Sequence, residues 1–163
     1  MKILEATAII GLLREIRSDN LIDKILKLNH ELIIPSHVYS EILDDISRKG
    51  CDKLIDSGKI RKSTLNTEKE INDFQKTYPY LGRGEADSIL HYEKLSKGKI
   101  SVYCILDDSK ARKIAKKHGI NFTGLIGLLK LMRKRDILSE KELKTILGKL
   151  RKSNFRFPKE LVK

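Results

Sequence analysis

Residues 102–120, VYCILDDSKARKIAKKHGI, pass from an apolar run through two adjacent aspartates into a strongly basic segment. The apolar run favours a buried strand, and the spacing of Ala111, Ile114 and Ala115 favours a helix with one apolar face. A strand followed directly by a helix is the building unit of sheets with parallel strands. One carboxylate would suffice to end the strand, so the second aspartate requires an explanation of its own.

Short apolar runs alternate with helical segments along the rest of the chain. The runs that predict strands are KIL near Lys2, ELII at 31–34, KIRKS near Lys59, ISVYCIL at 100–106 and INFT at 120–123. Helix ends are indicated by Pro35 as a first helical residue, by capping boxes at Thr67 with Glu70 and Ser139 with Glu142, and by Gly119 at a C-cap. The alternation predicts an α/β fold, a three-layer α/β/α sandwich around a mainly parallel central sheet.

The length of the chain, 163 residues and 18.7 kDa, suits one compact domain. No internal repeat and no linker rich in proline or glycine divides it. We therefore expect a single domain over residues 1–163, in which about 124–163 forms a C-terminal helical extension packed on the same core. The final residues, FRFPKELVK, are expected to be a short docked appendage.

The positive charge lies entirely in the second half of the chain. Residues 1–80 hold 13 Lys and Arg against 13 Asp and Glu, whereas residues 81–163 hold 21 against 9, which accounts for the net charge of +12. Such a one-sided field attracts polyanions and favours nucleic acid as a partner. The alternative is that the lysines form ordinary solvated helix faces, and charge alone does not separate the two.

Several classes of protein are disfavoured by composition. No run approaches the roughly 20 apolar residues that cross a bilayer, and Glu5 interrupts the N-terminal apolar segment, so we expect neither a membrane protein nor a signal peptide. Cys51 and Cys104 are far apart and have no second pair nearby, which indicates neither a disulfide framework nor a zinc site. The expected compartment is the reducing cytoplasm.

Acidic residues recur where ligands of parallel sheets bind, beyond the carboxyl ends of the strands. Glu5 follows the first predicted strand, and Asp107 with Asp108 follow a later one. Glu41 and Glu85 lie on helices expected to start on the same side. Alone, each acid is adequately explained as a helix cap or as a partner of the helix dipole.

Together, carboxylates from four segments would repel one another and raise each other's pKa unless a cation neutralised them. Ligands that are all oxygen select hard ions, which indicates Mg²⁺ or Mn²⁺. Such an ion beside a basic surface is typical of phosphodiester hydrolysis. Under this interpretation, one aspartate of the doublet caps the helix and faces the metal, while its neighbour either joins the metal shell or turns away.

Four motifs in order resemble the PIN domain family: MKILEATAIIGLL at 1–13, LIIPSHVYSEIL at 32–43, LGRGEADSIL at 81–90 and CILDDSKARKIAKKHGINFTGLIGLL at 104–129. The likeness is greatest to the prokaryotic branch related to VapC-type toxins, whose C-terminal helical extension resembles residues 123–152. The resemblance implies a sheet of parallel strands, an acidic Mg²⁺ or Mn²⁺ site and endoribonuclease activity on RNA. It also implies a small antitoxin protein as partner and a homodimer.

The resemblance maps the family's acids onto Glu41, Glu85 and either Asp107 or Asp108, with Asp87 in a supporting place. After the first strand the family usually has Asp, one residue, and then Ser or Thr. This chain keeps the hydroxyl with Thr7, but Glu5 adds a methylene that moves the carboxylate by on the order of 1 Å.

Two hypotheses therefore remain. The first is a metal-dependent ribonuclease, the toxin of a toxin–antitoxin pair, whose catalytic and metal-binding acids are Glu5, Glu41, Glu85, Asp107 and Asp108. The second is a catalytically weakened module that binds nucleic acid or a partner protein. A receiver-like phosphorylation domain is less consistent with the sequence, because its acidic pair would follow the first strand.

Candidate contacts to nucleic acid are cations near the proposed acids. Lys110, Arg112 and Lys113 point outward from the predicted helix after the doublet, and Arg83 directly precedes the GEAD motif. For the helix, a solvated face is the alternative interpretation. For Arg83, pairing with a nearby carboxylate is nearly as consistent.

Overall fold

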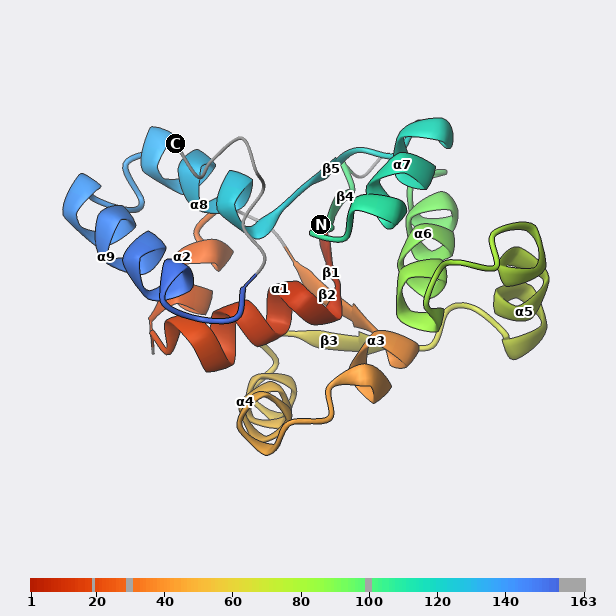
Figure 1. Cartoon of the computed structure of the whole chain (residues 1–163), viewed down its shortest axis with the longest axis horizontal. Helices are drawn as coiled ribbons and strands as arrows, with labels where there is room; N and C mark the ends of the chain where they lie inside the picture. Colours follow the sequence, from red (N-terminus) through yellow and green to blue (C-terminus); the bar gives the residue numbers. More distant parts are fainter. Residues whose placement is uncertain (19, 29–30, 99–100, 156–163) are drawn as a thin grey trace.

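The computed structural model describes residues 1–18, 20–28, 31–98 and 101–155. Its centre is a sheet of parallel strands in the order β3-β2-β1-β4-β5 (Figure 1). The strands are β1 (Lys2–Leu4), β2 (Leu32–Pro35), β3 (Arg61–Ser63), β4 (Tyr103–Ile105) and β5 (Phe122–Thr123). All five coincide with predicted apolar runs. The predicted strand start at Ile100 and the tail beyond Phe155 lie outside the described residues.

Helices cover both faces of this sheet. One group packs with the core that contains Leu4 and Ile105: α1 (Ala6–Ile10), its π-helical continuation η1 (Gly11–Ile16), α2 (Leu21–Leu26), α4 (Asp45–Asp56), α8 (Leu125–Lys134) and α9 (Glu140–Arg151). The other group packs with the core that contains Ile3 and Cys104: α5 (Glu68–Thr77), α6 (Arg83–Leu95) and α7 (Ser109–Lys117). The short α3 (Ser36–Glu41) follows β2 and contacts α6 extensively.

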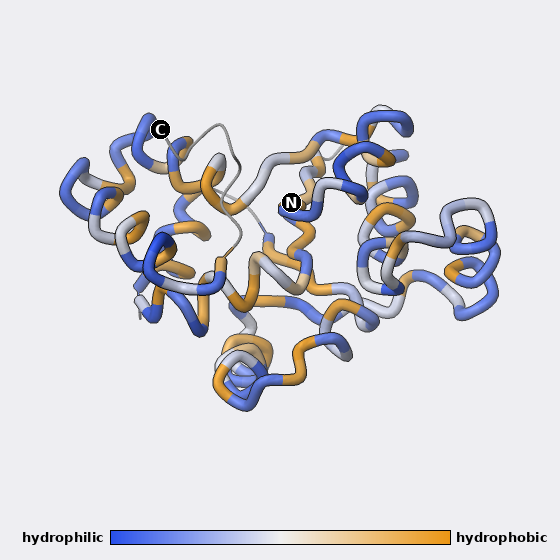
Figure 2. Tube along the Cα trace, in the orientation of Figure 1, coloured by the Kyte–Doolittle hydropathy of each residue, from blue (hydrophilic) through white to orange (hydrophobic). Residues whose placement is uncertain are grey.

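Alternation along the strands produces the two cores. Ile3 and Leu4 are neighbours in β1 yet belong to opposite apolar clusters, and so do Cys104 and Ile105 in β4. Figure 2 shows apolar colour concentrated in the central strands and on the inner sides of the helices. The predicted three-layer α/β/α sandwich is confirmed. The C-terminal helices α8 and α9 contribute to the same cluster as α1 and α2.

The local helix signals are largely in place. Both predicted capping boxes are present, at Thr67 with Glu70 and at Ser139 with Glu142. Gly119, which follows the C-cap His118 of α7, has a φ of +66°, a left-handed conformation that a residue with a side chain rarely adopts. Pro35 differs from expectation by one position, because it ends β2 and α3 begins at Ser36. No helix in the described ranges is long and apolar enough to cross a membrane.

Candidate active site

Glu5 connects the carboxyl ends of the neighbouring strands β1 and β4 through a hydrogen bond. It follows β1, is only 3% exposed, and its Oε1 accepts a hydrogen bond from the backbone N–H of Asp107 at 2.7 Å. Burial raises the pKa of Glu5 to about 8; the Asp107 N–H partly opposes this rise, and the charges of Asp107, Glu85 and Asp108 add to it. Acids from β1, β4 and α6 therefore share one electrostatic environment.

The two adjacent aspartates have different tasks. Asp108 is the N-cap of α7, and its Oδ1 accepts from the backbone N–H groups of Lys110 and Ala111 at 2.7 and 2.9 Å. Asp107 turns inward, where its Oδ2 accepts from Leu125 N–H at 3.0 Å and its Oδ1 from Arg112 Nη2 at 3.2 Å. Burial raises the pKa of Asp107 even though both contacts oppose the rise. Asp108 therefore caps the helix, whereas Asp107 places its carboxylate inside the candidate site.

Glu41 and Glu85 meet at the start of α6. Glu85 Oε2 accepts from Gly82 N–H at 2.6 Å, and Glu41 Oε1 accepts from Gly84 N–H at 2.8 Å. A Cβ atom placed on Gly82 would lie 3.3 Å from Glu85 Oε2 and 3.5 Å from Glu41 Oε1, so the two carboxylates face the same small space. Burial raises the pKa of Glu85, and the charges of Asp108 and Glu41 add to the effect.

The donor set has the chemistry of a site for a hard cation. Glu5 is buried and Glu85 and Asp107 are partly buried; the pKa values of all three are raised, and a divalent cation would offset the cost of ionising them. In the described part of the chain, however, no three His, Cys, Asp or Glu side chains are close enough to hold one ion as they stand. Each of the five predicted acids accepts a backbone N–H, which leaves other lone pairs of its carboxylate available to a cation. To share one ion, the side chains would have to move closer together.

Asp87 lies apart from these acids. It is 1% exposed, and its carboxylate accepts from Asn66 Nδ2 at 2.8 Å and lies 2.9 Å from His91 Nδ1. His91 Nε2 in turn lies 3.0 Å from Ser63 Oγ at the end of β3. Burial acts to raise the pKa of Asp87, but the hydrogen bonds from His91 and Asn66 outweigh it and hold that pKa below its ordinary value. Asp87 is therefore an ionised acid in a closed polar network.

The predicted cations divide into engaged and free groups. Arg112 donates through Nε to the carbonyl of Leu106 at 2.7 Å in addition to its contact with Asp107, so it positions an acid within the protein. Arg83 pairs with Glu68 and donates to Asn72 Oδ1 at 3.0 Å. By contrast, the predicted contacts Lys110 and Lys113 are exposed on α7, and Thr7 lies partly exposed in the first turn of α1.

Sequence reasoning missed the histidine that ties α3 to α6. His37 donates its backbone N–H to Asp87 Oδ2 at 3.2 Å, its Nδ1 lies 3.0 Å from the same oxygen, and its Nε2 lies 2.7 Å from Glu68 Oε1. The spacing of Asp87 and His91, four residues apart on one helix, was a usable signal for the network. Nothing in the sequence pointed to His37, because its partner lies 50 residues away.

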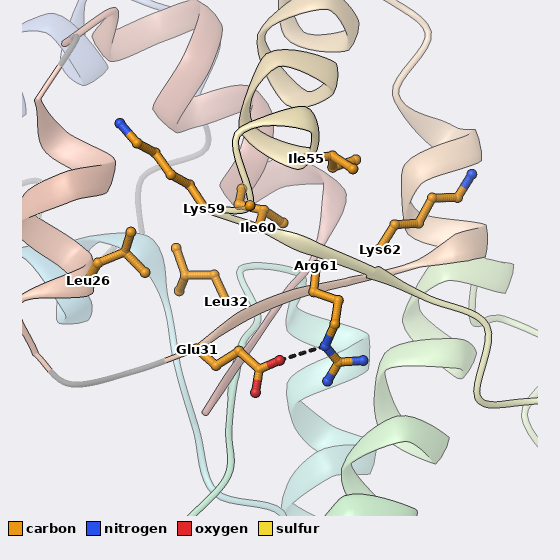
Figure 3. Close-up of a pocket in the computed structure, with 9 residues that line it drawn as sticks. Leu26, Glu31, Leu32, Ile55, Lys59, Ile60, Arg61 and Lys62 are labelled. Carbon is orange, nitrogen blue, oxygen red and sulfur yellow. Dashed lines mark hydrogen bonds and ion pairs between the residues drawn. The ribbon is translucent and has the colours of Figure 1, made fainter.

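A separate hollow of about 430 Å³ lies beside the sheet edge (Figure 3). Its lining includes Leu32 and Ile60 with Glu31 and Arg61 at the rim, and Arg61 Nε donates to Glu31 Oε1 at 2.5 Å. These residues precede or begin β2 and β3, whereas the proposed acids follow the strands. The hollow is therefore at the opposite end of the sheet and contains none of those acids.

Comparison with known families agrees with this geometry. A family model described as a PIN domain matches residues 1–163, which spans every element from β1 to α9. A search of curated proteins finds no match. The family resemblance drawn from the four motifs is thereby confirmed, while the narrower placement in the VapC-type branch stays a prediction.

Proposed function

We propose a function for this chain from one premise: it belongs to the PIN domain family. The fold of that family is of nuclease type and its members generally depend on a divalent metal, so the expected reaction is hydrolysis of a phosphodiester bond. We propose that the substrate is RNA and that cleavage is internal. The observation that supports the proposal is that acids from four segments influence or face one another: the charges of Asp107 and Glu85 act on Glu5, and Glu41 faces Glu85 beside Gly82.

The proposed cofactor is Mg²⁺ or Mn²⁺. The residues that would hold it are Glu5, Glu41, Glu85, Asp107 and Asp108. When bound, such an ion activates water and offsets negative charge on the phosphate. The raised pKa values of Glu5, Glu85 and Asp107 support this proposal, because acids that resist ionisation alone bind protons or a cation.

The protein's own groups position these acids. The backbone N–H groups of Gly82, Gly84 and Asp107 each hold one carboxylate oxygen, so the three acids are held at this end of the sheet. Arg112 holds Asp107 at the end of β4. The exposed lysines of α7 attract the phosphate backbone towards this end of the sheet.

The proposed cellular role is that of the toxin in a toxin–antitoxin pair, acting in the cytoplasm. A small antitoxin protein would cover the acids, and the toxin would act as a homodimer. This finer proposal rests on the likeness of residues 123–152 to the C-terminal extension of VapC-type toxins, a segment that folds here as α8 and α9.

A second candidate is a catalytically weakened module that binds nucleic acid or a partner protein. The observation that favours it is the position of Glu5, which is 3% exposed and directs Oε1 to the Asp107 backbone. With Oε1 held by the backbone, Glu5 has less freedom to adjust its carboxylate to a bound ion.

One cleavage experiment separates the candidates. Labelled RNA is incubated with the protein and Mn²⁺, with EDTA, and with the variant Glu85→Gln. The nuclease predicts cleavage that EDTA and Glu85→Gln both abolish, while Glu140→Gln, an exposed acid of α9, cleaves normally. RNA that is bound but never cleaved by the wild-type protein, purified free of contaminating nucleases, would support the second candidate.

A further inference from the structure

A row of lysines lies along one edge of α7. Lys110, Lys113 and Lys117 are spaced by three and four residues, so they share a side of the helix, and all three are exposed. None of them makes an ion pair with a residue in the described ranges. Figure 2 colours much of the α7 segment as hydrophilic. The row therefore presents uncompensated positive charge to solvent.

The row connects two distinct groups of side chains. At its first end, the charge of Lys110 acts on Glu85, one of the proposed catalytic acids. At its other end, Lys117 Nζ lies 5.4 Å from the centroid of the Tyr78 ring. The helical rise puts about 10 Å between these ends. The lysines thus lead from the acids to an aromatic group.

Tyr78 is the centre of the aromatic group and is held there by ring packing and by a hydrogen bond. Its ring packs against Phe74 with centroids 5.0 Å apart, and its hydroxyl lies 2.9 Å from His118 Nε2 at the end of α7. His118 Nδ1 is in turn 2.7 Å from Glu93 Oε1 on α6. Tyr78 itself is 8% exposed, so it supports the group and is not available to a ligand.

Tyr80 is the member of this group that faces solvent. It is 51% exposed, and its ring meets Tyr78 edge-on, at 72° and 6.5 Å between centroids. It lies two residues before Gly82, whose N–H holds Glu85. Tyr80 packs on the ring of Tyr78, the same ring that Lys117 approaches, so Tyr80 and the lysine row share one supporting side chain. Proteins bind single-stranded nucleic acid with such pairs of features: bases stack on exposed aromatic rings, and phosphates follow the cations.

We propose that Tyr80 and the lysine row Lys110, Lys113 and Lys117 form a binding track for single-stranded RNA that ends at the acids. The inference rests on the proposed ribonuclease function for its choice of RNA. A base stacked on Tyr80 must be free of its own helix, so paired RNA does not fit the track. The track fixes which part of a strand reaches the acids.

The test measures binding without cleavage. A fluorescently labelled single-stranded RNA oligonucleotide is titrated with protein in EDTA, and anisotropy gives the Kd. Loss of one stacked base predicts that Tyr80→Ala raises the Kd by on the order of 10-fold. Tyr80→Phe keeps the ring and should bind normally. Tyr103→Ala removes another exposed tyrosine, 39% exposed and in β4, and should leave the Kd unchanged.

The lysine row has its own readout. Lys113→Gln should lower the dependence of log K on log salt by about 0.7 for a single strand, whereas Lys130→Gln on the exposed side of α8 should not. The track is refuted if Tyr80→Ala binds like wild type, if duplex RNA binds as tightly as the single strand, or if no binding is measurable. Single-stranded DNA binding at least as tightly would overturn RNA as the ligand. Since EDTA blocks cleavage, these results are independent of whether the protein is a nuclease.

Discussion

Asp87 of α6 receives the backbone N–H of His37 of α3 at 3.2 Å and lies 3.0 Å from the Nδ1 of the same residue. These two helices carry Glu85 and Glu41, and the contact between them is extensive. The buried Asp87 therefore helps to hold together the two helices that carry these acids. It acts on the proposed site through helix position and contacts no acid of the cluster in any described hydrogen bond.

We predict that Asp87→Asn weakens both the fold and the site. The asparagine amide would turn an N–H group towards a donor that now binds the Asp87 carboxylate, either the His37 backbone N–H or the Asn66 side chain. That donor would lose its acceptor, and one unsatisfied buried group costs about 1–3 kcal/mol. Urea denaturation should show a loss of this size, and cleavage should fall because α3 is no longer held. Asp73→Asn, on the exposed side of α5, should change neither measurement. A stable Asp87→Asn with full activity would contradict the positioning role.

Gly84→Ala is predicted to impair activity without loss of stability. A Cβ at this position would clash with the carboxylate of Glu41, which lies against the helix start. The carboxylate can swing away at little cost to the fold, and alanine is favoured over glycine within helices by up to about 1 kcal/mol. Thermal melting should therefore show unchanged or higher stability, while the cleavage rate drops.

The matched control for this variant is Gly148→Ala in α9. Nothing lies within 4 Å of a Cβ placed there, so the substitution gains helix propensity and disturbs no acid. It should raise the melting temperature with unchanged cleavage. Equal activity in both alanine variants would mean that the position of Glu41 against Gly84 does not matter.

The strands and the approximate location of the acids were predictable because both are local signals. Apolar runs marked all five strands, and an acid after a strand lies at the carboxyl edge wherever the sheet is parallel. The division of labour between Asp107 and Asp108 was not predictable. It depends on the N–H of Leu125, which α8 brings to Asp107 from 18 residues further along.

The same limit applies to the cations. Helical periodicity placed Arg112 on the outward side of α7, yet its long side chain reaches the Leu106 carbonyl and Asp107. The π-helical turn η1 was also missed, because its wider winding leaves no distinct pattern of apolar residues. Contacts made by long side chains and between distant segments therefore account for most of the features that could not be predicted from the sequence.

The buried acids predict a stability that falls as the pH rises. The pKa of Glu5 is about 8 in the folded state against an ordinary value of 4.5, so between these values the unfolded chain has lost a proton that the folded chain retains. Unfolding is then favoured by up to roughly 1.4 kcal/mol per pH unit, and the effect levels off above the folded pKa. Urea denaturation in EDTA from pH 5 to 8 measures this slope.

Glu5→Gln should flatten that slope, and Mg²⁺ or Mn²⁺ should reduce it in the wild-type protein. The raised pKa values of Glu85 and Asp107 act in the same direction. Glu70 and Glu142 have pKa values lowered to about 2, so their contributions change below pH 4.5 and do not mask the effect. An unchanged slope in Glu5→Gln would show that Glu5 is ionised in the folded protein.

Glu5→Asp tests whether the longer acid suits this chain. The shorter side chain withdraws the carboxylate by on the order of 1 Å, which breaks the 2.7 Å hydrogen bond from Asp107 N–H while the backbone pairing of β1 with β4 remains. We expect slower cleavage and a higher Mn²⁺ requirement, measured as initial rates over a metal titration. Glu15→Asp, in η1, serves as the control and should cleave normally. Faster cleavage by Glu5→Asp would show the opposite, that Glu5 weakens a site built for aspartate, and would favour the weakened module over the working nuclease.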